Sequence, residues 1–279
     1  MESLACLNGE LMPVGEAKVP VWDRGFLFGD SVYEMFRLYQ GRLWLETEHM
    51  ERLRRSLGEM GYPAIDFGPL AARIRRTIAV SEVQEGTVYL QITRGVAPRR
   101  HAFPDPPVAL TELIVVRAYD DGPTARSRET GVGVISHPDL RWKRCDVKST
   151  NLLANVLANE AAHRAGCDEA VLVDGDGLVT EATHSSVLWV RNGRIEGTPE
   201  GAAILPGSTR RFSRELVGRA VGPLVEARVS LDGLKAADEV VLLGCNRAHA
   251  KDYAAFLGLF FAFPCRVPSS GRIFDCKYD

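Results

Sequence analysis

The stretch that most constrains this chain runs from 141 to 165, RWKRCDVKSTNLLANVLANEAAHRA, where a short extended run leads directly into a helical pattern. Asp146 and Lys148 are two residues apart, so an extended backbone places both side chains on one face. The small polar residues 149–151 are typical of a helix cap. The apolar residues after them recur at roughly helical spacing: Leu152, Leu153, Val156, Leu157 and Ala161. The pattern predicts an amine held at a strand-to-helix corner, with a rigid helix behind it.

Length and charge narrow the class of protein. The 279 residues suffice for two modest lobes or one large one, each with a real core. The net charge is −2, with acidic and basic residues intermixed. Such a balance gives no electrostatic basis for binding nucleic acid or an anionic membrane. We therefore expect small-molecule ligands.

The six cysteines, at 6, 145, 167, 245, 265 and 276, contain no CxxC pair and no regular spacing. They predict neither a metal site nor a disulfide framework. The N-terminus lacks a basic segment followed by an apolar core, and the longest apolar run, 256–265, is too short to cross a bilayer. We expect a cytoplasmic protein with reduced thiols.

Hydrophobic periodicity predicts an α+β or α/β protein with two domains. Cys6-Leu7 and Leu11-Met12 flank Asn8-Gly9, a strong hairpin dipeptide. Residues 31–39, SVYEMFRLY, predict a strand buried on both faces. Helices are expected near 47–60, 68–80 and 208–220. The polar stretch near 120–130 has no periodicity, so we expect a small α+β domain at 1–120, a linker at 121–130 and a larger, mixed α/β, barrel-like domain at 131–279.

Three other segments carry residues suited to small-molecule chemistry. LVTEATHSS, at 178–186, places Glu181 among apolar and small residues. The proline-rich loop 95–107 carries Arg99, Arg100 and His101, which predict an anion trap on a mobile connection. In ILPGSTR, at 204–210, a glycine and two hydroxyl residues open a helix, the geometry that binds phosphate. A solitary lysine is usually a solvated surface charge, but these segments together favour a functional role for Lys148.

The motifs CDVKS-NLL around Lys148, TE followed by small hydroxyl residues, and RGVAPRRH resemble the class IV (fold-type IV) pyridoxal-phosphate aminotransferases. The resemblance runs from about Leu7 to about Leu243. It implies a fold-type IV enzyme with pyridoxal 5'-phosphate as cofactor. Within that family it favours transamination of D-amino acids, such as D-alanine, with a 2-oxo acid acceptor.

The resemblance also implies roles for cofactor-binding residues. Lys148 would form a Schiff base with the cofactor aldehyde and then shuttle the proton. Glu181 would keep the ring nitrogen protonated, and Arg52, in EHMERL, would grip the phosphate through two nitrogens. The other implied cofactor-binding residues are Ser185, Ser208, Thr209 and Tyr33.

The substrate carboxylate would be held by Arg99 and His101 with help from Tyr33. In the family the residues that correspond to Arg99 and His101 reach the partner subunit's site, so the resemblance implies a homodimer. Arg100, between them, would point away. No metal is expected.

Some residues depart from the family pattern. Cys245 and Asn246 stand where hydroxyl residues are expected near the phosphate, His184 and Ser186 replace more usual residues of the ring motif, and the tail from about Ala248 differs from the family's closing helix. Two alternatives to D-amino-acid transamination therefore stay open. One is a sibling activity, L-branched-chain aminotransferase or 4-amino-4-deoxychorismate lyase, and the other is a non-catalytic protein that binds the cofactor.

Overall fold

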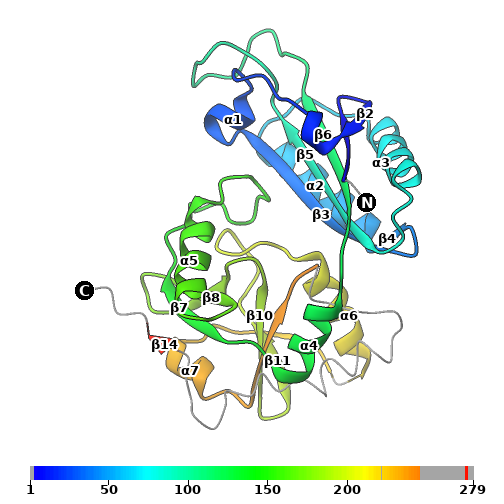
Figure 1. Ribbon diagram of the computed structural model, residues 1–279. Coiled ribbons are helices and arrows are strands. Elements are labelled where there is room, and N and C mark those ends of the chain that lie inside the picture. Colours follow the sequence, from blue (N-terminus) through cyan, green and yellow to red (C-terminus); the bar gives the residue numbers. More distant parts are fainter. Residues whose placement is uncertain (1–2, 221, 246–273, 276–279) are drawn as a thin grey trace. The chain divides into compact units, whose positions relative to one another are not determined.

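The computed structural model describes residues 3–220, 222–245 and 274–275 (Figure 1). The chain divides into two compact units, one of residues 1–120 with 147–151 and the other of residues 121–146 with 152–279. The helices and strands of the first unit are β1 (Leu4–Leu7), β2 (Glu10–Pro13), η1 (Val14–Glu16), α1 (Arg24–Phe28), β3 (Ser31–Tyr39), β4 (Arg42–Leu43), α2 (Glu46–Glu59), α3 (Phe67–Ser81), β5 (Gly86–Thr93) and β6 (Thr111–Ala118).

The first unit is built on a six-stranded sheet in the order β2-β1-β6-β5-β3-β4. Its strands pair antiparallel. The predicted hairpin is confirmed: Leu7 pairs with Glu10, and Asn8 and Gly9 both take left-handed φ values of 51° and 91°. Two consecutive residues with positive φ make the turn that matches the twist of paired strands.

The two faces of this sheet differ. Most even-numbered residues of β3, β5 and β6, such as Phe36, Leu90 and Ile114, are buried, whereas several odd-numbered neighbours, such as Tyr33 and Tyr89, are half-buried. Helices α2 and α3 pack against the even face and complete its core. The prediction of a β3 buried on both faces therefore holds for the even face and only in part for the odd face, where Ser31 and Arg37 are buried but Tyr33, Met35 and Tyr39 are half-buried.

The second unit alternates strands and helices. Its elements are α4 (Gly122–Thr130), β7 (Val134–Pro138), α5 (Leu153–Arg164), β8 (Glu169–Val173), β9 (Val179–Ala182), β10 (Ser186–Arg191), β11 (Arg194–Gly197), α6 (Ser208–Ala220), β12 (Val225–Glu226), α7 (Leu231–Lys235), β13 (Glu239–Leu243) and β14 (Phe274–Asp275).

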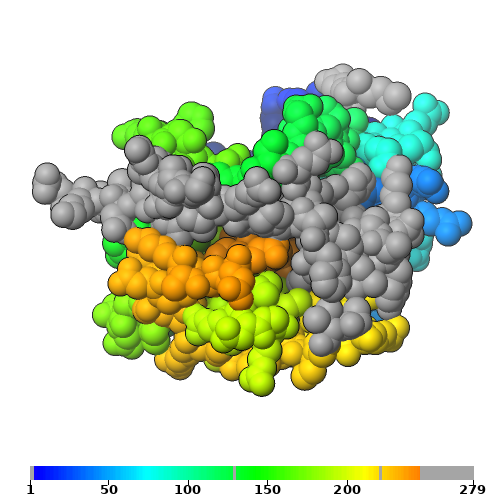
Figure 2. Space-filling view, turned by 90° about the horizontal axis from the view of Figure 1, so that it is seen from below, coloured from blue at the N-terminus to red at the C-terminus, as the bar shows by residue number. Residues whose placement is uncertain are grey.

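The described strands of this unit form two four-stranded sheets, β12-β11-β10-β13 and β14-β7-β8-β9. Strands β7 and β8 run parallel, whereas β8 pairs antiparallel with β9. Strand β13 pairs with β10, and Figure 2 shows the orange segment that contains β13 and α7 beside the yellow-green segment near residue 190. The Asn192 N–H donates to the Asp238 carboxylate at 2.8 Å and joins the same two segments. The predicted mixed α and β architecture is confirmed.

Three local features differ from the sequence-based expectations. Residues 122–130, predicted as a linker, form helix α4 with Pro123 in its first turn, a position where proline is well tolerated. Residues 147–151 join the first unit, although they lie inside the range predicted for the larger domain. Ser149 to Asn151 do not cap α5, which begins after Leu152 without a side-chain cap.

The apolar stripe expected on the helix after Lys148 is largely exposed. Leu153, Val156 and Leu157 are 71%, 57% and 56% exposed, whereas Ala158 and Ala162 are buried against β7 and β8. Small side chains let α5 approach its sheet closely, so its alanine face packs inward in place of the leucine face.

No helix within residues 3–220 and 222–245 is both long and apolar enough to span a membrane. The predicted departure at Asn246 lies outside the described residues, and of the divergent tail from Ala248 only residues 274–275 are described, as β14.

Candidate active site

Lys148 is fixed through its backbone to two elements of the first unit. Its carbonyl accepts a hydrogen bond from the Tyr33 N–H at 3.1 Å, and its own N–H donates to the Ser56 hydroxyl of α2 at 3.2 Å. Ser149 forms a β-bridge with Val32 of β3. The lysine therefore lies on a short extended segment that runs beside β3, and not on a helix start.

The amine of Lys148 lies over an aromatic ring on the odd face of the sheet. Its Nζ is 4.3 Å from the Tyr33 ring centroid, within the range of a cation–π contact. The Tyr33 ring is 5.7 Å from that of Tyr89, whose hydroxyl donates to Gln91 at 2.7 Å. Burial and the nearby Tyr33 raise the pKa of Tyr89 to about 12. These contacts confine the amine to one side of the sheet and keep Tyr89 neutral.

The hydroxyl residues predicted to cap α5 bind the first unit. Thr150 and Ser31 share a short hydrogen bond between their hydroxyls, and Asn151 donates to the Gly29 carbonyl at 3.2 Å. Gly29 has a left-handed φ of 63°, and an added Cβ would lie 2.5 Å from the Asn151 side chain. Residues 149–151 thus hold the lysine segment on the end of α1 and the start of β3.

On the opposite, covered face of the sheet, Arg52 belongs to a buried cluster. Its Nε and Nη2 donate to the two carboxylate oxygens of Glu34 at 2.8 and 2.6 Å, and His49 Nδ1 lies 2.6 Å from the same carboxylate. Burial alone raises the pKa of Glu34, but Arg52 and His49 lower it to about 2. The two-nitrogen grip predicted for the cofactor phosphate is made to Glu34 in this structure.

Arg99 and His101 lie on the exposed loop that follows β5, and both side chains contact one ring. The Arg99 guanidinium carbon is 5.3 Å from the Phe28 ring centroid, and the His101 ring centroid is 5.6 Å from it. The structure therefore brings together the two predicted trap residues on the end of α1. The Arg100 side chain is also exposed.

In the second unit, Glu181 on β9 is held by an arginine that the sequence reasoning did not single out. Arg141 Nη1 donates to one carboxylate oxygen, and the Leu205 N–H donates to the other at 3.2 Å. Asp139 binds the same arginine through two hydrogen bonds of 2.8 and 2.6 Å. Burial raises the pKa of Glu181, and Arg141 and the Leu205 N–H only partly offset that rise.

Helix α6 begins with the two predicted hydroxyl residues. Ser208 and Thr209 are buried, and their hydroxyls lie 3.5 and 4.0 Å from Cys245 Sγ. A Cβ on Gly207 would come within 2.9 Å of the Ser186 hydroxyl, so this turn has no room for a larger residue. Cys245, noted as a departure from the family pattern, thus stands beside the predicted phosphate hydroxyls.

Ser185 is buried in the second unit, and its hydroxyl donates to Glu169 at 3.0 Å. The fully buried Glu169 carboxylate also accepts from the Thr183 hydroxyl and the His184 N–H. The Ser185 hydroxyl is thereby oriented by a carboxylate, and His184 Nδ1 lies 3.3 Å from the same hydroxyl.

The residues that sequence reasoning missed are charged partners of predicted ones. Glu34 occupies an even, buried position of β3, and a carboxylate inside an apolar strand indicates that a cation faces it. Asp139 and Arg141 lie two residues apart at the start of the lysine segment, but nothing local in the sequence ties that pair to Glu181.

The profile of the amino-transferase class IV family matches residues 31–248, which include every predicted site residue. The chain belongs to the class IV aminotransferases. This class IV aminotransferase is 40% identical over 237 residues to the D-alanine aminotransferase of Staphylococcus epidermidis, covering 85% of this chain and 83% of the relative. It is 36% identical over 236 residues to that of Bacillus licheniformis, covering 84% and 82%.

Solved structures show the same fold. The class IV aminotransferase matches the branched-chain amino acid aminotransferase of Escherichia coli with a TM-score of 0.80 at 23% identity, covering 88% of this chain and 84% of that one. It matches an aminotransferase of Mycobacterium tuberculosis, bound to α-ketoglutarate and PMP, with a TM-score of 0.79 at 19% identity, covering 93% and 98%.

Class IV aminotransferases use pyridoxal phosphate, and the residues of this chain fit that group. Glu181 is a buried carboxyl oriented on both oxygens, and a carboxylate so placed favours a ring nitrogen that carries a proton. The start of α6 offers backbone N–H groups, two hydroxyls and a glycine whose missing Cβ leaves space. Lys148 supplies the amine.

Proposed function

We propose that this class IV aminotransferase transfers the amino group of D-amino acids, such as D-alanine, to a 2-oxo acid. The observation that carries the proposal is the match to D-alanine aminotransferases at 36–40% identity over 84–85% of the chain. The aminotransferase reaction itself follows from the family, so the proposal concerns the choice of substrate.

Lys148 is proposed to hold the cofactor through its Nζ and then to move a proton at the substrate. When bound, pyridoxal phosphate supplies a ring that stabilises negative charge on the substrate α-carbon. The freed amine of Lys148 stays tethered beside that carbon, so one residue can both bind and transfer the proton. Its position over the Tyr33 ring limits the directions from which it can act.

Glu181 is proposed to keep a proton on the cofactor's ring nitrogen. Its carboxylate is oriented on both oxygens, by Arg141 on one and by the Leu205 N–H on the other. A negative carboxylate beside a ring nitrogen favours the protonated form of that nitrogen, because opposite charges attract strongly in a buried site.

The phosphate is proposed to bind at the start of α6, through Ser208 and Thr209, with Arg52 as the cation and Ser185 as a nearby hydroxyl. The buried Ser208 and Thr209 hydroxyls and the tight turn at Gly207 support this assignment. Arg52 is fixed by Glu34, so it would act through charge and its remaining contacts and not through the two-nitrogen grip.

The substrate carboxylate is proposed to be held by Arg99 and His101, with Tyr33 contributing its hydroxyl. The support is their common placement: both trap residues lie against Phe28, on one exposed loop. A guanidinium and an imidazole that contact the same ring can both donate hydrogen bonds to a carboxylate.

The enzyme is proposed to be a homodimer in which Arg99 and His101 serve the partner's site. An apolar patch beside the trap loop supports self-association. Val21, Trp22, Phe26 and Val96 are 66%, 53%, 74% and 40% exposed, and Asp23 forms a β-bridge with Val96 that joins their two segments. Light scattering on the purified protein measures the mass that this proposal requires.

A cytoplasmic location is also proposed. Four of the cysteines, Cys6, Cys145, Cys167 and Cys245, carry free thiols, as expected in a reducing compartment. Fluorescence of a tagged protein in its host cell would test this.

The substrate proposal is tested with D-alanine and L-leucine as separate donors and 2-oxoglutarate as acceptor. We expect pyruvate from D-alanine at a rate at least tenfold above ketoisocaproate from L-leucine, because the chain matches D-alanine aminotransferases at 36–40% identity. Turnover of L-leucine alone would reject the substrate choice while leaving the aminotransferase family intact. A visible cofactor band that no amino acid changes would indicate a protein that binds the cofactor without catalysis.

A further inference from the structure

The loop that carries Arg99 and His101 has little apolar anchorage of its own. Residues 98–103 are exposed, and no helix or strand includes any residue of 94–110. A loop of this kind samples many conformations unless polar contacts fix it. Two trap residues on such a loop need a device that holds their backbone.

Arg24 of α1 supplies that contact. Its Nη1 donates to the Arg100 carbonyl at 2.6 Å and to the Ala102 carbonyl at 3.3 Å, and its Nη2 donates to the His101 carbonyl at 3.3 Å. One guanidinium thus binds three consecutive carbonyls around the second trap residue. Arg24 itself is buried, with 3% of its surface exposed.

Asp30 fixes Arg24 and joins it to a second buried arginine. The Asp30 carboxylate accepts from Arg24 Nε at 2.8 Å and from Arg94 Nε at 2.8 Å. All three side chains are at least nine-tenths buried. A buried carboxylate between two guanidinium groups would lose strong hydrogen bonds if it moved. The three side chains therefore form a rigid network, the Arg24–Asp30–Arg94 network.

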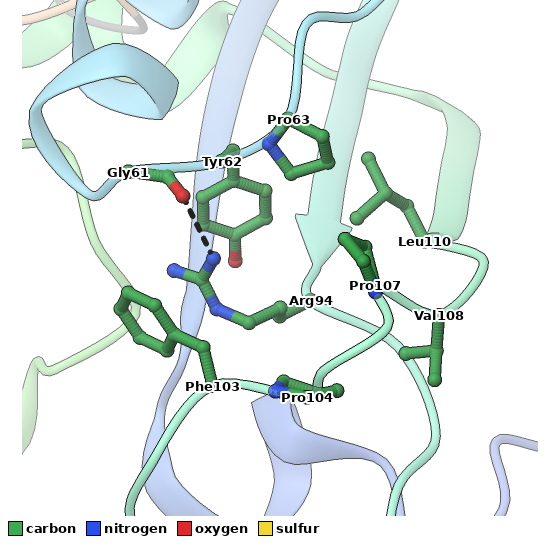
Figure 3. A pocket seen from close by; sticks show the side chains of 9 residues that line it. All are labelled: Gly61, Tyr62, Pro63, Arg94, Phe103, Pro104, Pro107, Val108 and Leu110. Atoms are coloured by element: carbon green, nitrogen blue, oxygen red, sulfur yellow. Dashed lines mark hydrogen bonds between the residues drawn. The ribbon is translucent and has the colours of Figure 1, made fainter.

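Arg94 connects this network to the end of α2 and to the far half of the loop (Figure 3). Its Nη1 and Nη2 donate to the carbonyls of Gly61 and Met60 at 3.0 and 2.7 Å. Its guanidinium carbon lies 4.2 Å from the Tyr62 ring centroid and 3.6 Å from that of Phe103. These rings line a pocket of about 260 Å³ whose other walls come largely from loop residues 104–110.

Helix α1 is itself held in place by Asp23 at its start. The Asp23 carboxylate accepts from the Gly25 N–H at 2.8 Å and from the Thr93 and Thr111 hydroxyls at 2.9 and 2.6 Å. At its other end, Phe28 contacts both trap side chains. Backbone and side chains of the trap are therefore positioned from the same short helix.

We propose that the Arg24–Asp30–Arg94 network, with Phe28, is a positioning device that holds Arg99 and His101 in the geometry that binds the substrate carboxylate. This inference rests on the proposed role of those two residues. None of the four touches the reacting atoms in the proposal. Their loss would weaken substrate binding more than the chemical step, because a displaced trap still leaves Lys148 and Glu181 unchanged.

The test compares Arg24→Lys in two backgrounds, the wild type and the double variant Arg99→Ala with His101→Ala, and Arg99→Ala alone is measured beside them. Lysine keeps the charge but loses the fork that reaches three carbonyls. We expect Arg24→Lys to raise KM for D-alanine about tenfold, with kcat within about twofold and the cofactor absorption band unchanged. In the background that lacks both Arg99 and His101 side chains, the same change should alter KM by less than about twofold, because the trap is already lost.

An equal KM increase in both backgrounds would overturn the positioning role, since the effect would then not pass through the trap. Should Arg99→Ala itself leave the KM for D-alanine unchanged, the trap assignment fails, and with it the proposed function of this loop. Phe28→Leu offers a second route if Arg24→Lys does not fold, because it keeps the apolar bulk and removes the ring beneath Arg99 and His101. Phe28→Leu should also raise KM in the wild type and change it little where the trap is already lost. An equal effect of Phe28→Leu in both backgrounds would equally reject the proposal.

Arg73→Gln is the matched control. Arg73 also makes a two-nitrogen pair in the first unit, with Glu112 at 2.7 Å for both bonds, but it contacts no loop carbonyl. It should leave the KM for D-alanine within about twofold of the wild type. A tenfold increase in this control would show that any lost arginine pair perturbs the loop, and would contradict a specific role for Arg24.

Discussion

At the scale of single residues, the assignments depend on Lys148. Lys148→Ala should remove the visible absorption band of the bound cofactor at neutral pH and reduce turnover below detection, because no other amine takes the same place on the sheet. Borohydride reduction followed by peptide mapping should label position 148 in the wild type. A wild-type protein that gains colour with added cofactor but carries its label elsewhere would contradict the assignment.

The buried Glu34 gives a prediction about stability and pH. Its pKa is lowered to about 2, so the stability it contributes is present above its ordinary pKa of about 4.5 and is lost as pH falls from there toward 2. Glu34→Gln leaves Arg52 and His49 without their carboxylate, so at pH 7 it should lower the free energy of unfolding by about 3–5 kcal/mol. The gap between variant and wild type should shrink as pH falls through that window.

Urea unfolding of the cofactor-free protein at several pH values measures this gap. Glu46→Gln is the control on the same helix, since its pair with Arg75 is exposed and should change stability by less than about 1 kcal/mol. A gap that stays constant from pH 7 to pH 3 would show that Glu34 is not the titrating group.

At the scale of elements, the start of α6 is the sharpest test of the phosphate site. Gly207→Ala should weaken affinity for pyridoxal phosphate about tenfold or more, because its Cβ would come within 2.9 Å of the Ser186 hydroxyl. Gly201→Ala, in the same unit with open space around its Cβ, should leave that affinity unchanged. Titration of the cofactor-free protein, followed by absorbance, distinguishes the two. Equal affinities for both variants would remove the phosphate from this turn.

Periodicity and turn chemistry predicted those elements whose order is local. Asn8-Gly9 indicated its hairpin, and the apolar spacing of 47–60, 68–80 and 208–220 indicated helices α2, α3 and α6, because each pattern depends on neighbours a few residues away. Residues 149–151 were misread as a helix cap since their partners, Ser31 and Gly29, lie more than a hundred residues earlier. Long-range pairing of this kind leaves no local pattern.

In the candidate site, too, residues in local motifs were predicted and residues that depend on long-range contacts were not. Lys148, Glu181, Arg99 and His101 were found from motifs, because their chemistry restricts residue type and spacing. Arg24, Asp30 and Arg94 were not found, although they bind the trap loop, since their contacts join residues up to 78 apart. A charged residue in a strand or short helix whose neighbours are apolar remains the usable sign of such a partner.

At the scale of the whole molecule, the homodimer proposal predicts complementation between two defective variants. One subunit carries Arg99→Ala with His101→Ala, and the other carries Lys148→Ala. If the trap serves the partner's site, a heterodimer of the two has one complete site, made of Lys148 from the first subunit and the trap from the second. Each variant alone lacks a complete site.

Co-expression with two different affinity tags and tandem purification isolates that heterodimer. It should recover about half of the wild-type turnover of D-alanine per dimer, since one of its two sites is complete. A trap that serves its own subunit leaves neither site complete, and the heterodimer would then be no more active than the variants alone. Because the purified heterodimer is tested at a concentration where light scattering shows a dimer mass, the outcome separates the direction of the trap from the existence of the dimer.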